Sequence, residues 1–104
     1  MKKTIILLLV LASASFNSHA LELVTAKVTV LEPTYLPGSI SFQIDKSTSR
    51  CPAGRWIKWS KSEENNKAVY STLLAALSSQ NRINLYFDES DTECKASYLH
   101  ILRN

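Results

Sequence analysis

Few side chains in this 104-residue sequence are of types that perform catalysis, and their spacing matches no familiar active site. His100 is the one histidine beyond the first twenty residues, and no acid–base partner is indicated by its spacing. The motifs G-x-S-x-G and H-E-x-x-H and a glycine-rich phosphate loop are not found in the sequence. We therefore expect a protein that is not an enzyme, with no catalytic residue and no cofactor, in which His100 has a structural or surface role.

An acidic segment, residues 88–93, is the one candidate for a metal site. Its four carboxylates belong to Asp88, Glu89, Asp91 and Glu93, and hard cations such as Ca²⁺ take several oxygen ligands. The segment lacks the glycine and the distant glutamate of an EF-hand loop. A solvated hairpin tip explains it better, so no metal site is predicted.

Aromatic residues beside basic ones give the clearest indication of binding. Strand alternation would place Trp56 and Trp59 on opposite faces, so at most one of them belongs fully to the core. An exposed tryptophan beside basic side chains would offer a stacking platform for a sugar or an anchor for a protein partner. The alternative is ordinary core packing with a shielded rim. The candidate binding surface comprises Arg55, Trp56, Lys58, Trp59 and Tyr86.

The first twenty residues have the order of a secretory signal peptide. Lys2 and Lys3 precede an uncharged apolar run over residues 5–12, and Ser18-His19-Ala20 supplies small residues for a cleavage site. The apolar run is shorter than the roughly 20 residues that cross a bilayer, so no membrane span is expected after cleavage. The sequence predicts a bacterial precursor with a signal peptide at 1–20 and a single domain at 21–104, which is periplasmic or secreted.

Cleavage changes the charge balance of the chain. Two of the twelve basic residues lie in the signal peptide and all nine acidic residues remain, so the net charge falls from +3 to +1. Nucleic-acid binding requires a clustered basic face, and this weak surplus is spread along the chain. We therefore exclude a nucleic-acid partner.

Cys51 and Cys94 are the only cysteines, and both lie in the predicted exported domain. A metal site or a catalytic thiol lacks support because there is no C-x-x-C motif and one histidine remains after cleavage. Disulfides persist outside the cytoplasm, and small domains often need them. A Cys51–Cys94 disulfide closing a loop of about 44 residues would contribute roughly 4 kcal/mol, which rivals the net stability of a small domain.

Alternating apolar and polar residues predict five strands. Their ranges are 24–31, 39–45, 55–60, 83–88 and 96–102. Turn residues over 32–38 separate the first two strands, which should pair antiparallel. Cys51 lies in a polar surface loop, 46–54, that precedes the third strand.

One amphipathic helix, ending near Ser79, is predicted between the third and fourth strands. Ser60 and Glu63 have the spacing of a capping box, and Asn81 is the expected C-cap. The apolar stripe recurs at intervals of three and four residues. It comprises Val69, Leu73, Ala76 and Leu77.

The predicted fold class is mainly β with one helix, in the order β-β-β-α-β-β. The best match is a small OB-like five-stranded barrel, whose helix lies between the third and fourth strands. The alternative is an open α+β sheet with one packed helix. In either architecture, the disulfide would join the start of the third strand to the loop between the fourth and fifth.

This strand order with its interposed helix resembles that of the B subunits of pentameric bacterial toxins. The run Tyr70-Ser71-Thr72-Leu73-Leu74-Ala75-Ala76-Leu77, followed by Arg82-Ile83-Asn84-Leu85-Tyr86 and a late Cys94, also resembles small exported bacterial proteins of unassigned function. The similarity covers residues 51–101. Toxin B subunits form rings and bind glycans, so the resemblance implies a binding role and a homo-oligomer.

Two functions follow as expectations. The first is an exported non-enzymatic binding module for a glycan or a cell surface. The alternative is an envelope protein inhibitor or accessory subunit that acts through protein–protein contact, with loop 46–54 or 88–93 as the contact segment. Rings gain avidity from repeated weak sites whereas an inhibitor can act alone, so the oligomeric state separates the two.

Overall fold

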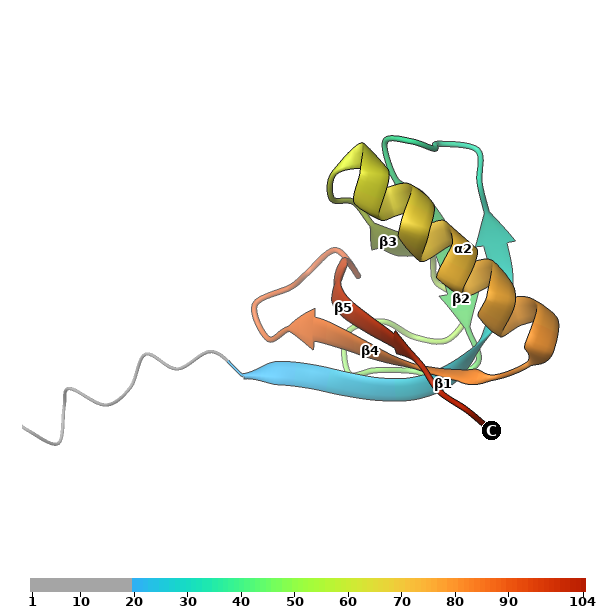
Figure 1. Ribbon diagram of the computed structural model, residues 1–104. Helices are drawn as coiled ribbons and strands as arrows, with labels where there is room; N and C mark the ends of the chain where they lie inside the picture. Colours follow the sequence, from blue (N-terminus) through green and yellow to red (C-terminus); the bar gives the residue numbers. More distant parts are fainter. Residues whose placement is uncertain (1–19) are drawn as a thin grey trace, which may run out of the picture.

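The computed structural model describes residues 20–104, and the predicted signal peptide lies outside them except for Ala20. Within this part of the chain, three strands are followed by a helix and two further strands (Figure 1). The elements are β1 (Leu21–Glu32), β2 (Ile40–Ile44), β3 (Ile57–Trp59), α2 (Glu63–Ser79), β4 (Arg82–Asp88) and β5 (Ala96–Ile101). The predicted fold class, mainly β with one helix in this order, is confirmed.

The strands form one antiparallel sheet in the order β3-β2-β1-β4-β5. The long strand β1 takes part in two ladders, pairing with β4 over Leu21–Lys27 and with β2 from Val28 to Glu32. A register shift between Val28 and Val30 marks a bulge, and a bulge bends and twists the strand that carries it. The predicted antiparallel pairing of the first two strands is confirmed.

The sheet is not closed into a barrel. Its two edge strands approach each other at one isolated parallel bridge between Lys58 and Lys95, where the Lys58 N–H donates to the carbonyl of Cys94 at 2.9 Å. The preferred architecture, a small OB-like barrel, is therefore wrong in its closure, and the alternative, an open sheet with one packed helix, is observed.

Alternate residues of the central strands form the core, as the period-two pattern predicts. Ile83, Leu85 and Phe87 of β4 are buried. Helix α2 covers the core with Leu73 and Ala76, which are also buried (Figure 1). The remaining large buried residues are Val24, Val28, Ile40, Phe42, Ile44, Ile57 and Trp59.

Both predicted caps of the helix are wrong by one or two residues. The N-cap is Ser62, whose side chain accepts the N–H of Asn65 at 3.2 Å, while Ser60 donates to the carbonyl of Gly38. Two serines, Ser60 and Ser62, precede the glutamates. Ser62 is the N-cap because the helix begins at the next residue, Glu63. The C-cap is Gln80 with φ 60°, one residue before Asn81.

The predicted disulfide is confirmed. Cys51 and Cys94 are bonded, with their Cα atoms 5.8 Å apart, and both side chains are buried. The bond joins the loop before β3 to the loop between β4 and β5, which are the two segments that the sequence led us to expect.

Candidate functional site

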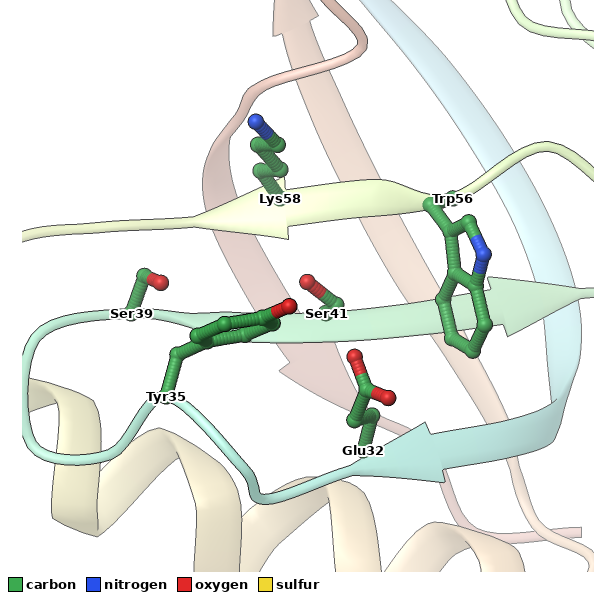
Figure 2. A pocket seen from close by; sticks show the side chains of 6 residues that line it. All are labelled: Glu32, Tyr35, Ser39, Ser41, Trp56 and Lys58. Atoms are coloured by element: carbon green, nitrogen blue, oxygen red, sulfur yellow. The ribbon is translucent and has the colours of Figure 1, made fainter.

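A cleft of about 340 Å³ lies on the outer face of β2 and β3, beside the end of β1. Figure 2 shows the six side chains that line it, with the ring of Tyr35 over β2, Glu32 directed toward β2 and the Lys58 side chain directed away from it. They are Glu32, Tyr35, Ser39, Ser41, Trp56 and Lys58. We call this site the β2–β3 cleft.

The strand register places three of these residues in one row. Glu32 of β1 pairs with Ser41 of β2, and Ser41 pairs with Lys58 of β3. Paired residues share a face, and neighbouring strands lie about 4.8 Å apart, so the backbones of Glu32 and Lys58 are separated by roughly 10 Å across the row. Glu32 and Lys58 therefore come from the strands on either side of Ser41, and no ion pair joins them.

None of the cleft's polar side chains has a partner within residues 20–104. The one ion pair found there joins Arg50 to Glu22, so the charges of Glu32 and Lys58 are not paired. The side chains of Tyr35, Ser39, Ser41 and Trp56 also form no hydrogen bond to the described residues. Six side chains that can donate or accept hydrogen bonds therefore line one concave surface and have no partner in the described part of the chain.

Two exposed aromatic rings flank the cleft. Tyr35 is 59% exposed and its ring lies over β2, whereas Trp56 is 41% exposed and stands at the other end, near Glu32 (Figure 2). Large exposed aromatic side chains are costly to leave in water and commonly contribute most to binding. Their position on either side of unpartnered polar groups suits a ligand with both apolar and polar faces.

Helix α2 fixes the turn that carries Tyr35. The carbonyl of Tyr35 accepts the N–H groups of Gly38 and Ser39 at 2.9 and 3.2 Å. The fully buried side chain of Asn66 donates to the carbonyls of Pro37 and Gly38 at 2.8 and 3.1 Å. Asn66 also accepts the N–H of Lys61, so one buried amide anchors the turn to the start of the helix.

The five residues of the predicted binding surface do not form a single surface. Arg55, Trp56 and Lys58 lie together, since a second hollow of about 470 Å³ beyond Trp56 and Lys58 is lined by these three with Thr92 and Glu93. Trp59 is 4% exposed, and its indole N–H donates to Asn65 at 2.9 Å. The opposite orientation of the two tryptophans is therefore confirmed.

Tyr86 lies elsewhere, on β4. Its ring is half-buried and meets the ring of His100 edge-to-face, with centroids 5.4 Å apart. The two rings belong to paired strands, because Tyr86 pairs with Tyr98 and Asn84 with His100. His100 thus packs against an aromatic ring on the outer face of the sheet.

Sequence reasoning missed Glu32, Tyr35, Ser39 and Ser41. Residues 32–38 were predicted to be a turn, and no binding role was predicted for them. The alternation that turns Ile40 and Phe42 inward also turns Ser39 and Ser41 outward, toward the face of Trp56 and Lys58. That pattern could have identified the cleft.

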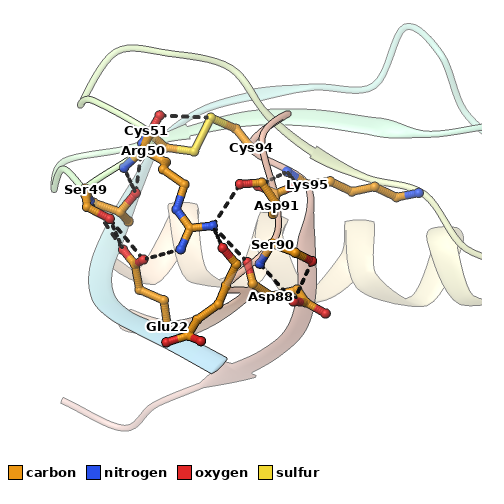
Figure 3. A network of polar contacts seen from close by, with 11 residues as sticks. Glu22, Ser49, Arg50, Cys51, Asp88, Ser90, Asp91, Cys94 and Lys95 are labelled. Atoms are coloured by element: carbon orange, nitrogen blue, oxygen red, sulfur yellow. Dashed lines mark hydrogen bonds and ion pairs between the residues drawn. A yellow bond between two sulfur atoms is a disulfide. The ribbon is translucent and has the colours of Figure 1, made fainter. Parts of the chain in front are cut away.

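The acidic loop is organised by Arg50, as Figure 3 shows. The guanidinium group donates to the carbonyls of Asp88, Glu89 and Asp91, and it lies 3.4 Å from the carboxylate of Glu22. The Asp91 carboxylate accepts the N–H of Lys95. Within residues 20–104, no three His, Cys, Asp or Glu side chains are arranged to hold a metal ion.

Comparison of the chain with protein families, with known proteins and with solved structures gives no match in any of the three. None of the helices described by the structure is long and apolar enough to cross a membrane.

Proposed function

We propose that this protein is an exported, non-enzymatic module that binds carbohydrate in the β2–β3 cleft. The observation that carries the proposal is a set of four polar side chains, Glu32, Ser39, Ser41 and Lys58, which have no partner among residues 20–104 and share the cleft with two exposed aromatic rings, Tyr35 and Trp56. Sugars present hydroxyl groups that both donate and accept, together with an apolar ring face that stacks on aromatic side chains. The cleft offers polar groups for the hydroxyls and aromatic rings for the apolar face.

The charges favour a neutral sugar. Glu32 contributes one carboxylate and Lys58 one ammonium group, so the cleft has no net charge. The carboxylate would accept hydrogen bonds from sugar hydroxyls and would repel an acidic substituent placed near it. Lys58 and the indole N–H of Trp56 are the matching donors.

Several weak sites would act together if the protein assembles. The cleft is small, and ligand hydroxyls must exchange water for protein partners, so a single site should bind weakly. A homo-oligomer would repeat the cleft and raise the avidity for a glycan-covered surface. Light scattering on the oxidised exported protein measures its oligomeric state. A mass of several protomers supports the avidity argument, and the mass of a monomer contradicts it.

Export is part of the proposal. A buried disulfide is the form expected in an oxidising compartment, such as the periplasm or the medium outside the cell. Tracking the precursor in cell fractions, with mass spectrometry of its N-terminus, tests export and cleavage after Ala20.

A glycan array with matched variants tests the binding function. The wild-type protein should retain neutral oligosaccharides, and Trp56→Ala should weaken that binding by roughly 10-fold or more because it removes a stacking surface. Tyr98→Ala is the control, since Tyr98 is a comparably exposed aromatic residue, 58% accessible, outside the cleft. Binding by no glycan, or equal losses in both variants, would refute the proposal.

A second function, as an envelope protein inhibitor or accessory subunit, is favoured by the joined loops of Figure 3. The disulfide and the Arg50 hydrogen bonds fasten loop 46–54 to the acidic loop, which makes one rigid surface unit. Rigid loops lose little entropy on binding a protein. A photo-crosslinker at exposed Ala53 tests this in intact cells: a single discrete adduct that Arg50→Ala abolishes supports it, and no adduct contradicts it.

A further inference from the structure

The outer edge of β5 has no backbone partner in the described part of the chain. β5 is the last strand of the sheet and pairs only with β4, and the bridge to β3 is made one residue earlier, at Lys95. The N–H of Leu102 donates to the carbonyl of Arg82 at 2.8 Å. Because antiparallel pairs alternate, the N–H and C=O groups of Leu99 and Ile101 must then point away from β4.

This edge lacks the usual protection against pairing with another chain. Natural edge strands carry charges or prolines, or are covered by another element. Residues 96–102 contain neither a charged side chain nor a proline. The opposite edge strand, β3, carries Lys58 and is joined to Lys95. Of the two edge strands in the described part of the chain, β5 is the one that is open to an added strand.

A groove of about 370 Å³ runs along this edge. Residues 97–100 line its strand side, Asn65 and Val69 line its helix side, and Trp59 and Lys61 complete it. Four strand residues span roughly 13 Å, which is the length of a short extended segment. Because α2 flanks the edge, the space admits one extended chain more readily than the edge of a second sheet.

Lys61 gives the groove an unpaired positive charge. Its ammonium group lies 5.2 Å from the ring centroid of Trp59 and 5.8 Å from that of Tyr98, so two aromatic rings hold it across the groove. The single ion pair among residues 20–104 does not involve it. Glu63 and Glu64 of the first helical turn are not among the residues that line the groove. A carboxylate is the complementary group.

We propose that the groove between β5 and α2 binds an extended peptide of a partner protein, which adds as a strand to the edge of β5 and places a carboxylate on Lys61. Backbone hydrogen bonds to Leu99 and Ile101 would supply affinity, and the Lys61 contact would supply selectivity. The carboxylate could belong to an acidic side chain or to the free C-terminus of the peptide. This site is separate from the β2–β3 cleft and does not depend on carbohydrate binding.

A hexapeptide library, immobilised through the N-terminus, tests the proposal on the oxidised exported protein. Half of the peptides end in a free carboxylate and half in an amide, each with and without acidic side chains. Retained peptides should carry a carboxylate, and the two halves show whether the side chain or the C-terminus provides it. Lys61→Gln should weaken binding by about 2- to 5-fold, the effect of a partly exposed ion pair. The control, Lys67→Gln, changes an exposed lysine of α2 that does not line the groove.

Hydrogen exchange on the complex locates the bound peptide. A peptide paired with β5 should slow exchange of the Leu99 and Ile101 amides by about 10-fold or more, since exchange then requires the added strand to leave. The proposal is overturned if no peptide is retained, if retained peptides leave both amides at their unbound rate, or if the two lysine variants behave alike.

Discussion

Removing the Cys51–Cys94 disulfide should destabilise the protein by about 4 kcal/mol. The two cysteines are separated by 43 residues. In the chain-entropy model, a loop of about this length restricts the unfolded chain by roughly 13 cal/mol/K, which is about 4 kcal/mol at 25 °C. A small domain has a net stability of about 5–15 kcal/mol, so this loss is a large part of the total.

Urea unfolding of the exported protein measures the loss. With a slope near 1 kcal/mol/M, as small domains show, the midpoint should fall by about 3–4 M in Cys51→Ala/Cys94→Ala. Reduced wild-type protein should behave like the double variant, and reductant should leave the double variant unchanged. These controls separate the cross-link from the packing of the two buried sulfur atoms.

The same perturbation should have a local consequence at the edges of the sheet. The carbonyl of Cys94 accepts the N–H of Lys58, so the disulfide also supports the bridge between β3 and the segment before β5. We expect faster hydrogen exchange at Lys58 after reduction. A fall in unfolding free energy below about 1 kcal/mol would refute the assignment of the disulfide as the main covalent constraint on the unfolded chain.

Three further predictions concern the helix and its contacts. Leu73→Ala should lower the free energy of unfolding, measured with a chemical denaturant, by about 2–5 kcal/mol because Leu73 is fully buried. The control, Leu74→Ala, changes an exposed residue and should alter stability by less than about 0.5 kcal/mol. Equal effects would mean that the buried face of the helix is misassigned. Asn66→Ala should cost about 1–3 kcal/mol because it removes partners of the Pro37 and Gly38 carbonyls, and an unchanged midpoint would contradict this role. Gln80→Gly should raise stability by about 0.5–1 kcal/mol because φ is 60° at that residue, and a loss measured by thermal unfolding would show that the side chain matters more than the backbone.

The sequence predicted the strands and the helix because their apolar residues follow clear periods. Ile83, Leu85 and Phe87 alternate with polar residues, and all three are buried. The caps were less predictable, because Ser60 and Ser62 both precede glutamates and the choice depends on the tertiary contact of Ser60 with Gly38. The preference for a closed OB-like barrel over the open sheet was wrong, since closure depends on hydrogen bonds between strands that are distant in sequence.

The cleft was predicted in part. Trp56 and Lys58 were predicted as binding residues because aromatic and basic residues lie next to each other in a short predicted strand. Glu32 and Ser41 did not, because their place beside Lys58 depends on the register of three strands. Pairing register follows from turns and core packing, and a single sequence does not specify it residue by residue.

Two-dimensional NMR of the two tryptophan side chains during a sugar titration tests the central claim most directly. The protein has two indole N–H groups: Trp56 lines the cleft, and the indole N–H of Trp59 is bonded to Asn65 in the core. Carbohydrate binding in the β2–β3 cleft predicts that a neutral oligosaccharide shifts the Trp56 signal with saturation and leaves Trp59 in place. A saturating shift of Trp59 alone, or no shift of Trp56 with any sugar tested, would contradict the account.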